Sequence, residues 1–152
     1  MQELKQEEGF FSDCAVLLSS CKLKNFDYQE EKQEIPSSLN LNCGISIDLK
    51  PFLEFVKFCR RVDNEKIAFE MDDNNLRLSI NDLNYRLIGK GEGISKKTSF
   101  SVEYLYRILT SFSAKELKEF EKIDFFFNSN GDYPIRINLR TNWFVLAPRV
   151  EY

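Results

Sequence analysis

The chain has 152 residues, of which 43% are hydrophobic and 30% are charged, and this length and composition are typical of one globular domain with a hydrophobic core. No apolar stretch approaches the roughly 18 residues that a bilayer-spanning helix needs. The charged first ten residues do not resemble a secretory signal. We therefore expect an intracellular protein without a membrane contact, located in the nucleus if its source is eukaryotic and in the cytoplasm otherwise.

The sequence contains no histidine, which excludes Ser-His-Asp and Cys-His catalysis and removes the most common general base. Its four cysteines lack C-x-x-C spacing, so reduced, mostly buried thiols are favoured over a four-thiolate zinc site at Cys14, Cys21, Cys43 and Cys59. A net charge of −3 argues against a basic coat over the whole surface but permits a local basic face. We expect a protein that is not an enzyme, with no catalytic residue, metal site or cofactor.

The first 42 residues differ in character from the rest. Residues 1–9 are expected to be flexible or loosely helical. Residues 10–26 include "CAVLLSSC" and predict one strand or a strand pair. Residues 27–42 are polar, contain a proline and have no period, which is typical of a connector loop.

From residue 43 onward, alternation of apolar and polar residues is the dominant signal and predicts antiparallel strands with one buried face. Two segments have a helical period instead, with Pro51 in a first turn and Ser101 as an N-cap. In chain order the expected elements are a strand at 44–49, a helix at 50–63, strands at 66–73, 75–82 and 85–90, a helix at 101–113, and strands at 122–130, 133–141 and 142–148.

This order contains a repeat, because strand, helix and three strands follow one another twice, at about 43–90 and 98–148. Two βαβββ units predict an α+β fold in which both helices lie on one face of antiparallel sheets. Residues 43–152 would then form one domain. Its edge strands, expected at 84–90 and 142–148, or the strand of "CAVLLSSC", would continue a sheet into another subunit.

Three local motifs are interpreted as structural. The "GKGEG" segment at 89–93 does not match a phosphate-binding loop and is expected to be a flexible loop. The "KELKEFEK" segment at 115–122 is expected to be a solvated loop or a helix extension. Four aspartates are expected to be turn residues rather than metal ligands, namely Asp63, Asp72, Asp73 and Asp82.

The exposed faces of the two helices carry cations. The first helix contributes Lys57, Arg60 and Arg61, and the second contributes Arg107. Two interpretations stay open on chemistry alone, a solvated helix face and a nucleic-acid contact.

Several segments resemble sliding clamps of the proliferating cell nuclear antigen family, over roughly residues 14–152. The final "DYPIRINLRTNWFVLAPRVE" is similar to the closing strands of the family, with its Leu-Ala-Pro. The segment "SFSVEYLYRILTSFSA" resembles the last clamp helix, and "ISIDLKPFLEFVKFCRRV" resembles the first helix of the carboxy-terminal domain. The segment "KLKNFDYQEEKQEIPSSLNLNC" is similar to the interdomain connector.

The resemblance implies a non-catalytic DNA clamp built as a ring of such domains, with helices lining a channel around double-stranded DNA. The DNA-facing cations would be Lys57, Arg60, Arg61 and Arg107. Polymerases or repair proteins with short helical motifs would dock in an outer pocket, and other clamp subunits would complete the ring. Carried over to this sequence, the pocket residues are Ile35, Pro36, Pro134, Ala147, Pro148 and Val150.

The sequence departs from the family in three ways. Only one full clamp domain fits, with residues 10–26 resembling the end of a preceding one. The second helix carries Glu103 and Thr110 where cations are expected, and Gln33 and Glu34 precede the connector Ile-Pro pair. A replicative clamp, a checkpoint-clamp-type subunit, and an adaptor that does not encircle DNA therefore remain alternatives.

Overall fold

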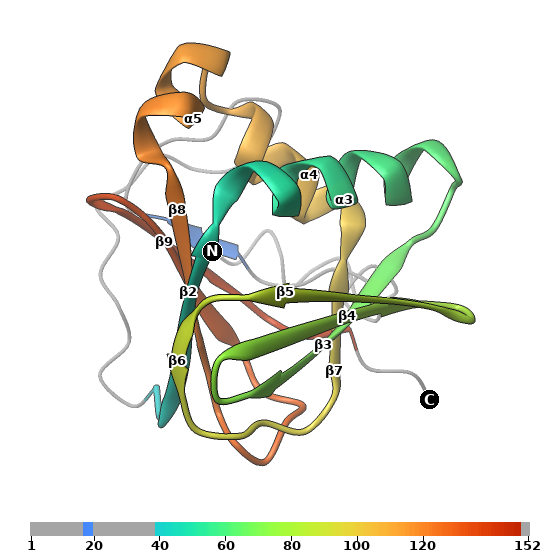
Figure 1. Ribbon diagram of the computed structural model, residues 1–152, viewed down its shortest axis with the longest axis vertical. Coiled ribbons are helices and arrows are strands. Elements are labelled where there is room, and N and C mark those ends of the chain that lie inside the picture. The colour runs from blue at the N-terminus through green and yellow to red at the C-terminus, as the bar shows by residue number, and fades with distance from the viewer. Residues whose placement is uncertain (1–16, 20–38, 150–152) are drawn as a thin grey trace, which may run out of the picture.

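The computed structural model describes residues 17–19 and 39–149 (Figure 1). The predictions for residues 1–9 and for most of the connector lie outside this part of the chain, as do those for Cys14 and Cys21. The described residues form an α+β fold with two antiparallel sheets and three helices. The helices are α3 (Leu49–Arg61), α4 (Val102–Thr110) and α5 (Ala114–Phe120).

The strands fall into a six-stranded sheet and a four-stranded sheet. In spatial order, the larger sheet contains β1 (Leu17–Ser19), β10 (Asn142–Leu146), β9 (Ile135–Leu139), β8 (Lys122–Phe127), β2 (Cys43–Asp48) and β6 (Lys90–Glu92). The smaller sheet contains β5 (Leu83–Ile88), β4 (Asn75–Ile80), β3 (Lys66–Asp72) and β7 (Thr98–Ser101).

The predicted repeat is present, as β2-α3-β3-β4-β5 and β7-α4-β8-β9-β10. Each half gives its first strand to the sheet of the other half. Strand β2 pairs with β8, in the register Ile45↔Phe125, and β7 pairs with β3, in the register Phe100↔Ile67. This exchange makes the two halves one folding unit, since neither sheet is complete without the other half.

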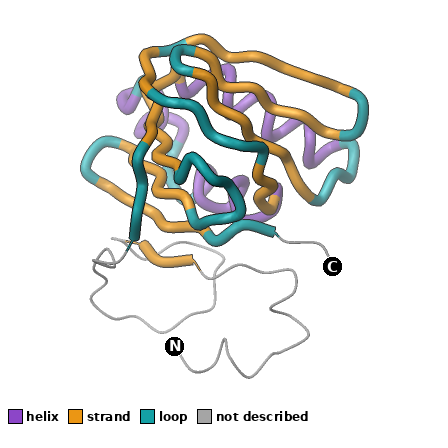
Figure 2. The backbone as a smooth tube through the Cα atoms, turned by 90° about the horizontal axis from the view of Figure 1, so that it is seen from below, coloured by secondary structure: helices purple, strands orange, loops and turns teal. Residues whose placement is uncertain are grey.

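The helices lie together on one side of the strands, as Figure 2 shows. Helix α3 follows β2 directly, and its buried side chains recur at helical spacing, as Phe52, Phe55, Val56 and Cys59. Helix α4 begins at Ser101, whose hydroxyl accepts a hydrogen bond from the Tyr104 amide at 3.1 Å, as predicted for an N-cap.

The core between the helices and the sheets is rich in phenylalanine. Phe52 of α3 contacts Phe125 of the larger sheet and Phe69 of the smaller sheet, with ring centroids 5.0 and 6.0 Å apart. Phe69 also packs against Phe100, at 5.4 Å and close to perpendicular. Such edge-to-face pairs stabilise the core beyond their buried area. They fix the position of α3 against both sheets.

The two described cysteines, Cys43 and Cys59, are free and buried, as expected for structural thiols. Burial raises the pKa of the Cys59 thiol to about 11. Within the described residues, no three histidine, cysteine or acidic side chains gather into a group that could hold a metal ion. No described helix is both long and apolar enough to cross a membrane.

The prediction of a flexible loop at 89–93 is wrong. Residues 90–92 form β6, which pairs with β2, so the chain crosses here from the smaller sheet to the larger one. A Cβ atom on Gly89 would lie 2.0 Å from the carbonyl oxygen of Ser46, and one on Gly91 would lie 2.2 Å from the carbonyl oxygen of Asp73. These glycines therefore serve close packing, which their sequence signal does not distinguish from flexibility.

The segment at 115–122 is neither a loop nor an extension of α4. It forms the separate helix α5, which a capping box at Ser113 and Glu116 begins. The helix expected at 101–113 is shorter in the structure, so Phe112 lies after the end of α4. It packs instead against Phe120 and Phe144, with centroids 5.1 and 6.2 Å away.

Of the two expected edge strands, one is correct. Strand β5 pairs only with β4 among the described residues, so it is an edge. Strand β10 is not an edge, because β1 pairs with it from the side opposite β9, with Leu18 opposite Val145. The early strand of "CAVLLSSC" thus covers the edge that the sequence analysis assigned to β10.

Candidate nucleic-acid and partner-binding surfaces

Helices α3 and α4 are neighbours that run antiparallel. Arg60, near the end of α3, contacts Glu103 in the first turn of α4. At the opposite end, Leu49 and Lys50 of α3 line the same groove as Thr110 of α4. The structure therefore brings the four predicted cations onto one helix pair, with Lys57, Arg60 and Arg61 exposed and Arg107 half-buried.

Glu103 connects two of these cations. Its Oε1 atom accepts a hydrogen bond from Arg60 Nε at 3.3 Å, and its Oε2 atom accepts one from Arg107 Nε at 2.9 Å. The Arg60 guanidinium also lies over the ring of Tyr106, 4.2 Å from its centroid. Partial burial raises the pKa of Glu103, but the hydrogen bonds and charges of Arg107 and Arg60 outweigh it and hold that pKa below its usual value.

Lys57 and Arg61 differ from this pair. Both are exposed on α3, and neither has an ion-pair partner within residues 17–19 and 39–149. Of the four predicted cations, these two are therefore the ones that form no ion pair with a described residue. They are the strongest candidates for contact with a phosphate backbone.

Three of the six predicted pocket residues can be located. Strands β9 and β10 pair with Ile135 opposite Leu146, so Pro134, just before β9, lies opposite Ala147, just after β10. Pro148 follows, and all three are partly buried. The structure thus brings Pro134, Ala147 and Pro148 to one end of a strand pair. Ile35, Pro36 and Val150 lie outside the described residues.

The chain after Pro148 is held at Arg149. The Arg149 amide donates to the carbonyl oxygen of Ser99 at 2.8 Å, which forms a bridge to β7. Its guanidinium lies 3.3 Å from a carboxylate oxygen of Glu65. The last described residue therefore links the larger sheet to the edge of the smaller one.

The open edge at β5 carries an apolar surface that the sequence analysis did not identify. Leu83, Tyr85 and Ile88 are 45%, 40% and 68% exposed. The Tyr85 ring stacks on Phe55 of α3, with centroids 4.9 Å apart and planes at 2°, and Phe58 beside it is also exposed. The sequence signal was present for one face, because Leu83 and Tyr85 alternate with the buried Leu87. Ile88 lies on the opposite face of the strand, where it interrupts the polar positions Asn84 and Arg86.

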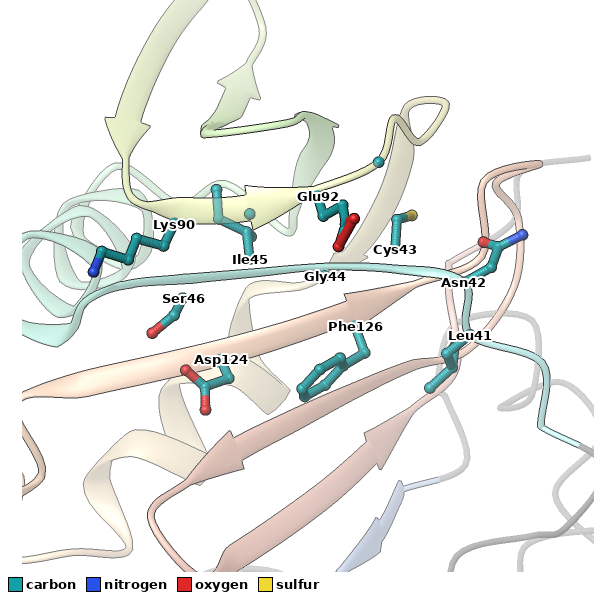
Figure 3. Close-up of a pocket in the computed structure, with 12 residues that line it drawn as sticks. Leu41, Asn42, Cys43, Gly44, Ile45, Ser46, Lys90, Glu92, Asp124 and Phe126 are labelled. Atoms are coloured by element: carbon teal, nitrogen blue, oxygen red, sulfur yellow. The ribbon is translucent and has the colours of Figure 1, made fainter.

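A shallow hollow lies on the outer face of the larger sheet, between β8, β2 and β6 (Figure 3). Asp124 and Phe126 of β8 form one side of it and Lys90 and Glu92 of β6 the other. Gly44 of β2 leaves room on this face for the Phe126 ring, because a Cβ on Gly44 would lie 2.8 Å from that ring.

Known structures with a similar backbone are sliding clamps. Proliferating cellular nuclear antigen from Entamoeba histolytica matches with a TM-score of 0.64 and 18% identity, over 82% of this chain and 52% of that one. The DNA polymerase sliding clamp from Bacillus subtilis matches with a TM-score of 0.61 and 17% identity, over 78% of this chain and 32% of that one. The DNA polymerase III beta subunit from Thermotoga maritima matches with a TM-score of 0.59 and 18% identity, over the same shares of the two chains.

The chain has the sliding-clamp fold. This confirms the fold expected from the family resemblance, including helices on one face of antiparallel sheets. No protein-family model matches the sequence, and no curated protein sequence matches it. The chain spans about a third of the length of the bacterial clamps and about half of the amoebal one.

Proposed function

We propose that this chain is a non-catalytic, sliding-clamp-like protein that associates with or encircles double-stranded DNA and tethers polymerases or repair factors. The observation that carries the proposal is the antiparallel pair α3 and α4 on one side of the sheets (Figure 2). Lys57 and Arg61 are exposed on α3 and have no ion-pair partner among the described residues. Contacts from such cations to the phosphate backbone carry no base information, so they would hold DNA and still let the protein slide.

Encirclement would require assembly. We infer that residues 43–152 are one clamp domain and that further copies, or a different clamp subunit, complete a ring. The open edge of β5, with Leu83, Tyr85 and Ile88 exposed, favours pairing with a strand of another subunit. An apolar surface beside an unpaired strand is a common feature of subunit interfaces.

Partner proteins would dock on the outer surface near Pro134, Ala147 and Pro148. Short helical motifs with apolar anchors bind such sites, and tethering then raises the effective concentration of an enzyme at the DNA without new chemistry. The proposed location is the nucleus in a eukaryote and the cytoplasm in other cells.

The test combines solution mass with DNA binding. We expect light scattering to give a multiple of the chain mass, and a 30-base-pair duplex to bind with an affinity that falls steeply with salt. The double variant Lys57→Glu with Arg61→Glu should abolish that binding, whereas Lys97→Glu, an exposed change outside the helices, should leave it within about twofold. Binding that is insensitive to salt and to the double variant would contradict the proposal.

A second candidate is a clamp-derived adaptor subunit that does not encircle DNA. Glu103 favours it, because this one carboxylate offsets part of the charge of Arg60 and Arg107. A stable monomer or a simple heterodimer without salt-dependent DNA binding would select this alternative. A checkpoint-clamp-type subunit would differ from both, since it would bind DNA only in a mixed ring with other clamp chains.

A further inference from the structure

A groove of about 980 Å³ lies between the first half of α3 and helix α5. It exists because α4 ends at Thr110, and the chain then turns through Ser113 into α5 without continuing along α3. The groove opens at the end of the helix pair opposite to the contact between Arg60 and Glu103. It is therefore separate from that ion-pair network, although Lys57 borders both the groove and the helix face.

The floor of the groove is apolar and well supported. Leu53, Phe112 and Leu117 are partly buried residues packed against the core. Phe112 is supported from below by Phe144 of β10 and from the side by Phe120 of α5. Such a floor favours an aliphatic or aromatic anchor from a ligand.

The rim is basic. Lys50, Lys57 and Lys118 are exposed and border the groove, and within the described part of the chain none of the three has an ion-pair partner. Lys50 and Lys57 are seven residues apart and so lie two turns apart on the same face of α3. A fourth lysine, Lys122, is paired with Asp48 at 2.6 Å, and the carboxylate of Glu121 also borders the groove. Four lysines and two carboxylates therefore leave the rim with a net positive charge.

We propose that the α3–α5 groove binds a short acidic peptide segment of a partner protein, with an aliphatic or aromatic anchor between its carboxylates. The three rim lysines complement the acidic residues and the floor of Leu53, Phe112 and Leu117 takes the anchor. A DNA backbone fits less well, because phosphates are held by cations and hydrogen-bond donors and gain nothing from an apolar floor. The peptide site does not depend on whether the chain encircles DNA, but the shared Lys57 would make peptide and DNA compete.

The test uses a fluorescein-labelled synthetic peptide, EDELFDEL, and a control, EDESGDES, of equal charge without the anchors. Fluorescence anisotropy with the full chain should show saturable binding of the first, with a dissociation constant of order 10 μM, and at least tenfold weaker binding of the second. The variant Lys50→Glu with Lys118→Glu should weaken binding at least tenfold. The matched variant Lys97→Glu with Lys115→Glu makes the same charge change outside the groove and should bind as the wild type does.

All four substituted positions are on the surface, so circular dichroism should confirm that both double variants fold. Equal binding of the two peptides would overturn the proposal, because the apolar floor would then contribute nothing. An equal loss of peptide affinity in both double variants would also overturn it, because the rim lysines would then have no specific role. No saturable binding at 1 mM peptide, roughly a hundredfold above the expected constant, would also overturn it. A duplex that binds through Lys50 and Lys118 while the peptide does not would assign the groove to nucleic acid and overturn the peptide site, leaving the clamp proposal intact.

Discussion

Glu103 of α4 accepts a hydrogen bond from Arg60 of α3 at 3.3 Å while it also binds Arg107 of its own helix. This single carboxylate therefore joins the two helices and lowers the positive charge of the face they share. The two ion pairs of Glu103 have opposing effects on anion binding. They hold α3 and α4 together, but they also engage Arg60 and Arg107, which leaves Lys57 and Arg61 as the predicted cations available to an anionic ligand.

Replacing Glu103 with Gln should strengthen DNA binding. The amide can still accept a hydrogen bond but carries no charge, so Arg60 and Arg107 become available to phosphates. We expect a several-fold rise in duplex affinity and a steeper salt dependence, since each added phosphate contact raises the slope by about 0.9. The measurement is anisotropy of a labelled duplex across salt concentrations. If affinity is unchanged or falls, the cations on this face do not contact DNA.

The same substitution should cost stability in a pH-dependent way. The pKa of Glu103 is lower in the folded chain, so its stabilising contribution is present above the unfolded pKa of about 4.3 and is lost as the pH falls through the folded value. Both ion pairs are partly exposed to solvent, so each contributes little to stability. At neutral pH, the free energy of unfolding of the wild type should therefore exceed that of Glu103→Gln by only about 0.2–1 kcal/mol. Urea unfolding at several pH values should show this difference shrinking in acid. A difference that grows in acid would contradict the assignment.

The open edge of β5 predicts a variant that changes assembly without changing the fold. Ile88 is 68% exposed, so Ile88→Asp should alter the free energy of unfolding by no more than about 0.5 kcal/mol. It should nevertheless reduce the solution mass if β5 forms a subunit interface, because a carboxylate would be buried there without a partner. The matched control is Ile94→Asp, at another exposed isoleucine away from β5. Light scattering that gives the same mass for both variants and the wild type would exclude β5 from the interface.

The strands were predictable because one face of each is buried. The alternation of Ile67, Phe69 and Met71 in β3 reports that burial directly, and the structure buries all three. Alternation does not report which strand lies alongside. The exchange of β2 and β7 between the two halves, and the pairing of β1 with β10, depend on contacts between residues far apart in the sequence.

For the helix face, the exposure of side chains was predictable but the contacts between the two helices were not. Helical spacing correctly placed Lys57 and Arg61 on the exposed side of α3. It could not reveal that Arg60 and Arg107 share Glu103, since that contact depends on how close two helices lie. The groove between α3 and α5 was not predicted for a related reason. Lys50 and Lys118 border the same groove only because the chain turns between α4 and α5, and the sequence analysis did not predict that turn.

Gly93 should not tolerate a side chain. Its φ of +106° is rarely adopted by L residues, and a Cβ would lie 2.4 Å from the Cβ of Cys43. Its carbonyl oxygen and amide also bind the amide and the carboxylate of Asp73, at 2.8 and 3.0 Å, which holds the β3–β4 turn against β6.

We therefore expect Gly93→Ala to lower the free energy of unfolding by about 1–3 kcal/mol from backbone strain, with a further loss from the displaced Cys43. The control Lys90→Ala, at the exposed first residue of the neighbouring strand β6, should stay within about 0.5 kcal/mol of the wild type. Urea midpoints of the three proteins provide the measurement. If Gly93→Ala unfolds at the wild-type midpoint, the crossing between the sheets is a pliable loop after all, and the close packing of β6 on β2 does not constrain it.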